Sequence, residues 1–157
     1  MLRTFRGAVH PERWGRRGDC FSVTVDRTVS LADFVLAFYT SPPFKLERWI
    51  LRWLLRAPST DADARALAQG SAQQFSVWYA GARTPTQLLM CDRYERTRSW
   101  FRVVPLHDGR TLLQFGSDLA APPGSMRKNS MSGVRSLLFS LHTGYSHVLL
   151  CAAATRA

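Results

Sequence analysis

Residues 98–118 contain the pattern that decides the fold, RSWFRVVP (98–105) and TLLQFGSD (111–118) on either side of a His-Asp-Gly triplet at 107–109. Apolar and polar side chains alternate through much of both segments, as is typical of strands with one buried face. An Asp-Gly pair readily supplies the positive φ angles of a tight turn. The stretch therefore predicts a β-hairpin.

Three further segments have strand character: DCFSVTVDR (19–27), FSVWYAG (75–81) and QLLMCDR (87–93). The last two reach the hairpin through short connections, which favours an antiparallel meander over crossover units. The sequence thus predicts five strands, the first of them separated from the other four by about 50 residues of helical pattern.

The intervening region predicts two or three short helices. Ser30 is a suitable N-cap for the first, and Pro42-Pro43 both ends that helix and opens the second. A third is expected to begin near Thr60 and to end at Gly70. Helical spacing in the second helix gathers five apolar residues on one face: Leu46, Trp49, Ile50, Trp53 and Leu54.

The C-terminal part predicts one long helix. Apolar residues recur there at steps of three and four, namely Val134, Leu138, Leu141, Tyr145, either Val148 or Leu149, and Ala152. Such a stripe suits a helix that packs on a sheet. Residues 136–155 carry no formal charge, but their serines, threonine and histidines are too polar for a typical bilayer span. We therefore expect a buried helix, with a C-terminal membrane anchor as the alternative.

The chain of 157 residues is strongly basic, with 21 Lys and Arg against 11 Asp and Glu and a formal charge of +10. Its length fits one domain. Residues 1–18 are rich in arginine and predict a basic N-terminal arm, followed by a single domain over 19–157. A basic surface suits nucleic acid or an anionic membrane, and a merely solvated basic surface is the alternative.

Three cysteines, Cys20, Cys91 and Cys151, are far apart and form no CxxC pair. They indicate free thiols in the reducing cytoplasm. The sequence also shows no His, Cys, Asp and Glu cluster with ligand spacing. We therefore expect neither a metal nor another cofactor.

The order of these elements resembles the helix-grip fold of the START-like superfamily, which includes polyketide cyclases, aromatase/cyclases and plant lipid-binding allergens. Within it, DRYERTRSWFRVVP (92–105), HDGRTLLQFGSD (107–118) and LHTGYSHVLL (141–150) resemble an uncharacterised bacterial family. The likeness covers about residues 19–155. It implies an α+β fold in which an antiparallel sheet wraps around the long C-terminal helix. The five predicted strands depart from the seven that this fold often has.

The resemblance further implies an apolar cavity between sheet and helix that takes a hydrophobic or amphipathic small molecule. The candidate ligand-binding residues are Trp53, Tyr79, Phe101, Phe115, His142 and Tyr145. For the aromatic residues the alternative is core packing, and for the histidine it is a hydrogen bond within the core. Arg98 and Arg102 alternate onto one strand face, where they could bind an anion or form a solvated outer surface.

Three functions follow from these features. The first is a non-enzymatic module that binds a hydrophobic small molecule. The second is a cyclase- or aromatase-like enzyme that uses His142 or Tyr145 for acid–base chemistry. The third is a basic protein that binds nucleic acid or a membrane surface through residues 1–18 and the arginines of 93–102. GxSxG, P-loop and GxGxxG motifs do not occur in the sequence.

Overall fold

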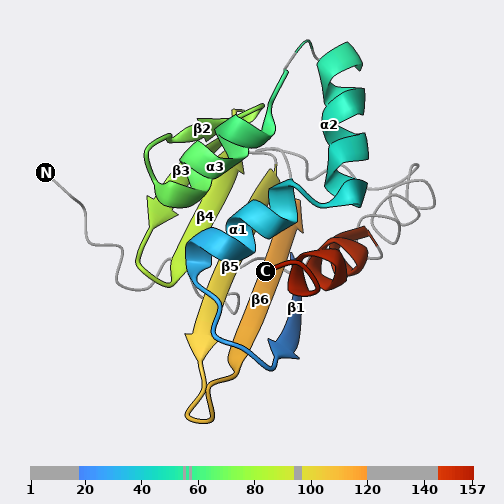
Figure 1. Cartoon of the computed structure of the whole chain (residues 1–157). Helices are drawn as coiled ribbons and strands as arrows, with labels where there is room; N and C mark the ends of the chain where they lie inside the picture. Colours follow the sequence, from blue (N-terminus) through green and yellow to red (C-terminus); the bar gives the residue numbers. More distant parts are fainter. Residues whose placement is uncertain (1–17, 55, 57, 94–96, 120–144) are drawn as a thin grey trace, which may run out of the picture.

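The computed structural model describes residues 18–54, 56, 58–93, 97–119 and 145–157. Within these ranges the chain is an α+β protein, in which one face of an antiparallel sheet is covered by helices (Figure 1). Residues 1–17 of the expected N-terminal arm and the first part of the expected C-terminal helix lie outside the described residues, and Gly18, the last residue of the expected arm, begins the first strand.

The sheet has six strands in the order β1-β6-β5-β4-β3-β2, and every neighbouring pair is antiparallel. Their bounds are β1 Gly18–Val25, β2 Gln74–Phe75, β3 Trp78–Arg83, β4 Gln87–Asp92, β5 Thr97–Pro105 and β6 Thr111–Leu119. The predicted meander runs from β2 to β6, and β1 joins its edge beside β6. Gly109 takes a φ of 78°, as the predicted hairpin requires.

One predicted strand is divided in the structure. The segment 75–81 was expected to be continuous, but Ser76 has a φ of 54° and the chain turns there. Phe75 of β2 therefore pairs with Trp78 of β3, and both aromatic side chains reach the helix-covered face. This turn is why the sheet has six strands rather than the five predicted.

Three helices follow the predicted order: α1 (Leu31–Tyr39), α2 (Pro42–Leu54) and α3 (Asp61–Gln69). Capping boxes at Ser30 and Thr60 begin α1 and α3, and Gly70, with a φ of 79°, ends α3. Each capping box satisfies N–H groups that a helix start leaves without partners. These local signals explain why the helix boundaries agree with the prediction.

Residues 145–154 are helical and pack on the same side of the sheet as α1 (Figure 1). Leu149, Leu150 and Ala153 are buried in the common core. The Arg27 guanidinium donates a hydrogen bond of 2.6 Å to the carbonyl oxygen of Ala154. A cation near the last carbonyls of a helix is favourable for the helix dipole, so Arg27 helps to fix this segment beside β1.

Three of the five residues on the predicted apolar face of α2 lie outside the core. Phe44 is buried, whereas Leu46, Trp49 and Trp53 are 61%, 60% and 70% exposed. In Figure 1, α2 stands to one side of the sheet and the other helices. The inward position on its second turn is taken by Arg48, whose guanidinium donates to the Ser59 carbonyl oxygen at 2.6 Å. This polar anchor turns the tryptophans outward.

In the described part of the chain, no helix is both long enough and apolar enough to cross a membrane.

Candidate functional site

The space between the sheet and the helices is filled by aromatic rings. Eight of them form a continuous set with centroid separations from 4.6 to 6.3 Å: Phe34, Phe38, Tyr39, Phe44, Phe75, Trp78, Phe101 and Phe115. Phe38 of α1 lies at the centre, 4.8 Å from Phe101 and 4.6 Å from Phe115. Edge-to-face and tilted rings of this kind add to the energy of area burial.

Among the described residues, buried hydroxyl groups belong to Ser41, Thr111, Ser117 and Ser146 and to the ring of Tyr39. Ser41 donates to the Phe38 carbonyl oxygen at 2.7 Å. Thr111 donates to the Arg27 carbonyl oxygen at 2.8 Å. Both hydroxyls thus form hydrogen bonds with backbone carbonyl oxygens. Within the described part of the chain, the interior contains no buried charged side chain.

Tyr145 lies at the rim of this interior. Its ring is half-buried against the core, and its hydroxyl donates to the Pro43 carbonyl oxygen at 3.3 Å. Pro43 belongs to the first turn of α2, next to the buried Phe44 ring. The tyrosine therefore brings a polar group to the edge of the aromatic rings, between α2 and the C-terminal helical segment.

The structure brings together three of the predicted ligand-binding residues. Phe101 and Phe115 are buried, with ring centroids 5.1 Å apart, and Tyr145 packs against the same core. Tyr79 alternates with the inward-facing Trp78 on β3 and so belongs to the opposite sheet face. Trp53 is exposed on α2 and does not line the interior. His142 lies outside the described residues.

Phe38 and Phe44 were not among the predicted ligand-binding residues, yet they occupy the helix-covered face beside Phe101 and Phe115. The helical spacing around Phe38 indicated a buried face. Phe44 had no such signal, because the predicted apolar face of its helix, which did not include it, suggested a different inner side.

Arg98 and Arg102 lie on the sheet face away from α1, with Trp100 between them. Both arginines are half-buried. The Arg102 Nη1 atom donates to Gln114 Oε1 of β6 at 3.5 Å. Trp100 is buried, and its Nε1 atom donates to Gln87 Oε1 at 3.1 Å. The predicted alternation is thus present, and Arg102 has a neutral cross-strand partner rather than a carboxylate.

A shallow groove of about 230 Å³ lies where α2 approaches the segment before α3, lined by Lys45, Arg48, Trp49, Arg52, Ser59 and Asp61. Asp61 receives hydrogen bonds from Lys45 at 2.8 Å and from Arg48 at 2.5 Å. These bonds, with that of Lys45 the larger cause, lower the pKa of Asp61. The sequence signal for this groove was the spacing of Lys45, Arg48 and Arg52 along one side of the helix.

On the C-terminal helical segment the Cys151 Sγ atom lies 3.8 Å from His147 Nε2 and 4.0 Å from Nδ1. Both residues are exposed. The centroids of the His147 ring and the Phe21 ring of β1 lie 5.6 Å apart in an edge-to-face arrangement. Among the described residues, no third His, Cys, Asp or Glu joins them as a metal-binding group would require. The pair is therefore a surface contact within one helix turn.

Comparison with models of protein families found no match, and a search of the curated proteins found none either.

Proposed function

We propose that the chain is a START-like module of the helix-grip type that binds a hydrophobic or amphipathic small molecule between its sheet and its C-terminal helix. The α+β architecture and the helical segment beside α1 are compatible with this fold. The observation that carries the proposal is the aromatic interior, with the hydroxyl of Tyr145 at its rim.

The apolar part of the ligand would contact Phe38, Phe44 and Phe115. These rings contact one another in this structure, so a ligand enters by exchanging ring–ring contacts for ring–ligand contacts. Flat rings and acyl chains make such contacts with little loss of packing. Entry also separates the first turn of α2 from the C-terminal helical segment, which breaks the Tyr145–Pro43 hydrogen bond.

The polar end of the ligand would accept the hydrogen bond that the Tyr145 hydroxyl donates to the Pro43 carbonyl oxygen in this structure. A hydrogen bond to an ionised acceptor is about twice as strong as one to a neutral acceptor. A carboxylate would therefore accept a stronger hydrogen bond from this hydroxyl than the Pro43 carbonyl oxygen does. The expected ligand is therefore an amphipathic acid rather than a neutral hydrocarbon.

Binding without transformation suits the groups that are present. General acid–base catalysis uses groups that titrate near the working pH, most often histidine or a carboxylate. The buried hydroxyls of Ser41 and Thr111 already donate hydrogen bonds to backbone carbonyl oxygens. Shape and one anchoring hydroxyl are sufficient for a binding module.

A polyene fatty acid whose fluorescence rises in an apolar site tests this proposal. We expect saturable binding of one molecule per chain. Tyr145→Phe should weaken it about threefold to tenfold, as the loss of one hydrogen bond implies. Val148→Ala is the matched control, because Val148 is an exposed apolar residue on the same helical segment. Unsaturable binding, or equal losses in both variants, would contradict the proposal.

A further inference from the structure

We propose that the outer face of α2 docks on the interface of an anionic lipid bilayer. This surface, called here the α2 stripe, consists of Leu46, Trp49 and Trp53 with Lys45 and Arg52 on its flank. It is separate from the aromatic interior, and the inference does not depend on the small-molecule ligand.

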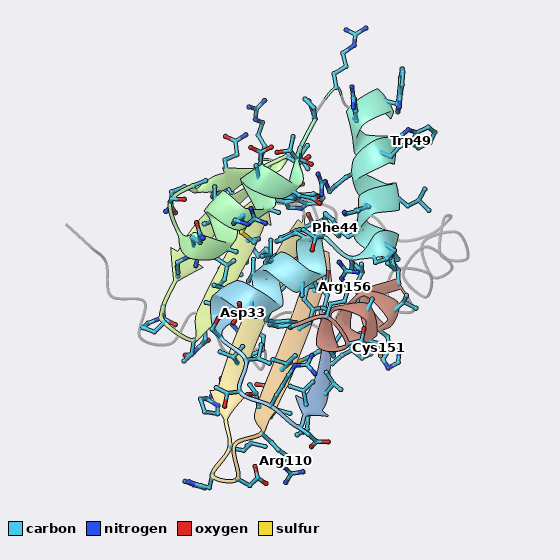
Figure 2. All side chains as sticks on the ribbon, in the orientation of Figure 1. Asp33, Phe44, Trp49, Arg110, Cys151 and Arg156 are labelled. Atoms are coloured by element: carbon cyan, nitrogen blue, oxygen red, sulfur yellow. The ribbon has the colours of Figure 1, made fainter. Side chains whose placement is uncertain are left out.

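The α2 stripe is a built feature of the helix. Leu46, Trp49 and Trp53 are three and four positions apart and therefore share one side. All three are at least 60% exposed, and the two indole centroids lie 6.4 Å apart in an edge-to-face arrangement. Figure 2 shows Trp49 on the outer side of α2 and Phe44 on the side toward the rest of the protein.

The orientation of the α2 stripe is fixed by contacts on the opposite side. The Phe44 ring packs 4.8 Å from Tyr39 and 5.8 Å from Phe38. Arg48 donates to the Ser59 carbonyl oxygen and to Asp61. Because these anchors point inward, the tryptophans face solvent as a consequence of the fold, and rotation of α2 to bury them would break the anchors.

The charges beside the α2 stripe favour an anionic surface. Lys45 and Arg52 lie along one flank of the helix. Lys45 is paired with Asp61, whereas Arg52 is exposed and takes part in none of the ion pairs among the described residues. Indoles prefer the interfacial layer of a membrane, and nearby cations are attracted to anionic headgroups. The apolar side chains of the α2 stripe and the cations on its flank together match the interfacial layer of an anionic membrane.

A second copy of the chain is a poorer occupant. A buried tryptophan contributes about 150–250 Å², so two indoles that are 60% and 70% exposed offer roughly 200–325 Å². A stable protein interface needs about 800 Å² from each partner. Nucleic acid is also a less suitable partner. Its bases would stack on the two indoles, but Leu46, which lies on the same side of the helix, would have no partner in such a complex.

Flotation of the full chain with vesicles tests the proposal. One vesicle set is pure phosphatidylcholine, and the other contains about one third phosphatidylglycerol. We expect partitioning into the anionic vesicles at least tenfold stronger than into the neutral ones. Trp49→Ala should weaken it about tenfold or more through lost apolar burial, and Arg52→Ala about fivefold through the lost headgroup attraction.

Val148→Ala and Arg110→Ala are the matched controls, because Val148 is exposed on another helix and Arg110 on the β5–β6 hairpin. Both should float like the wild type, and circular dichroism confirms folding of every variant. Absent flotation, or equal losses in test and control variants, would overturn the proposal. So would self-association or oligonucleotide binding that is lost in Trp49→Ala. Trp49→Ala should leave amphiphile binding intact, which separates this test from that of the proposed function.

Discussion

The Tyr145 hydroxyl donates a hydrogen bond of 3.3 Å to the Pro43 carbonyl oxygen, across a sequence separation of 102 residues. It joins the C-terminal helical segment to the first turn of α2, at the place where we expect a ligand to enter. Tyr145→Phe keeps the ring and removes only the donor. We expect the free energy of unfolding to fall by about 1 kcal/mol, measured by urea denaturation. An unchanged midpoint of urea denaturation would show that this hydrogen bond does not stabilise the native structure.

Thr111 connects β6 to the segment between β1 and α1. Its buried Oγ1 atom accepts a hydrogen bond from the Val29 N–H at 3.0 Å and donates one to the Arg27 carbonyl oxygen at 2.8 Å. Thr111→Val keeps the shape and leaves both backbone groups without this partner. We expect a loss of about 1–3 kcal/mol in the free energy of unfolding. Thr24→Val, at an exposed position of β1, should change it by less than about 0.5 kcal/mol.

Arg83 of β3 holds the end of α3. Its guanidinium donates to the carbonyl oxygens of Leu67 and Ala68, and burial lowers the pKa of Arg83. Arg83→Met should cost about 1.5–3 kcal/mol of stability, because two charge-assisted hydrogen bonds are lost. Arg83→Lys should recover only part of this, since lysine lacks the two-pronged donor. Arg65→Met, on the exposed side of α3, is the control, and equal losses at both positions would refute the role of Arg83.

The attachment of α2 should weaken in acid. Hydrogen bonds from Lys45 and Arg48 lower the pKa of Asp61 in the folded protein. A carboxyl group with a lowered folded pKa stabilises the native state above its unfolded pKa, and this stabilisation is lost as the pH falls through the folded value. The protection factors of the α2 amides, which correct for the intrinsic slowing of exchange in acid, should therefore fall below roughly pH 4.

Asp61→Asn is the control for this pH effect. It should make α2 exchange faster at neutral pH and reduce the acid dependence. Asp63 and Asp108 also have lowered pKa values, so global stability would retain an acid slope while the local effect on α2 disappears. The same acid dependence of α2 in Asp61→Asn and in the wild type would exclude Asp61 as its source.

Local signals predicted much of the fold. The capping residues Ser30 and Thr60, the Gly109 turn and the period-two segments each act through neighbouring residues, so a single sequence contains them. The division of segment 75–81 was not predicted, because Ser76 is a residue type that gives no strong signal for a positive φ. The antiparallel meander followed from short connections, whereas the pairing of β1 with β6 needs contacts distant in sequence.

The site was harder to predict because periodicity separates two faces without stating which one is inside. Trp78 and Tyr79 are adjacent aromatics, and only the packed structure turns the first toward the helices. The same limit applied to α2, where Arg48 rather than Trp49 faces inward. On β5, Trp100 is buried on the face that was expected to be polar. In each case tertiary packing, rather than the periodicity of the sequence, decided which face lies inside.

Native mass spectrometry of the full chain, purified without detergent, tests the central proposal most directly. We expect a population heavier than the bare chain by one discrete mass, at one molecule per chain. Denaturation should release an amphiphile with an acidic end, and Tyr145→Phe should carry less of it. A chain that shows only its own mass, and still does so after incubation with excess long-chain fatty acid, would contradict the proposed binding function.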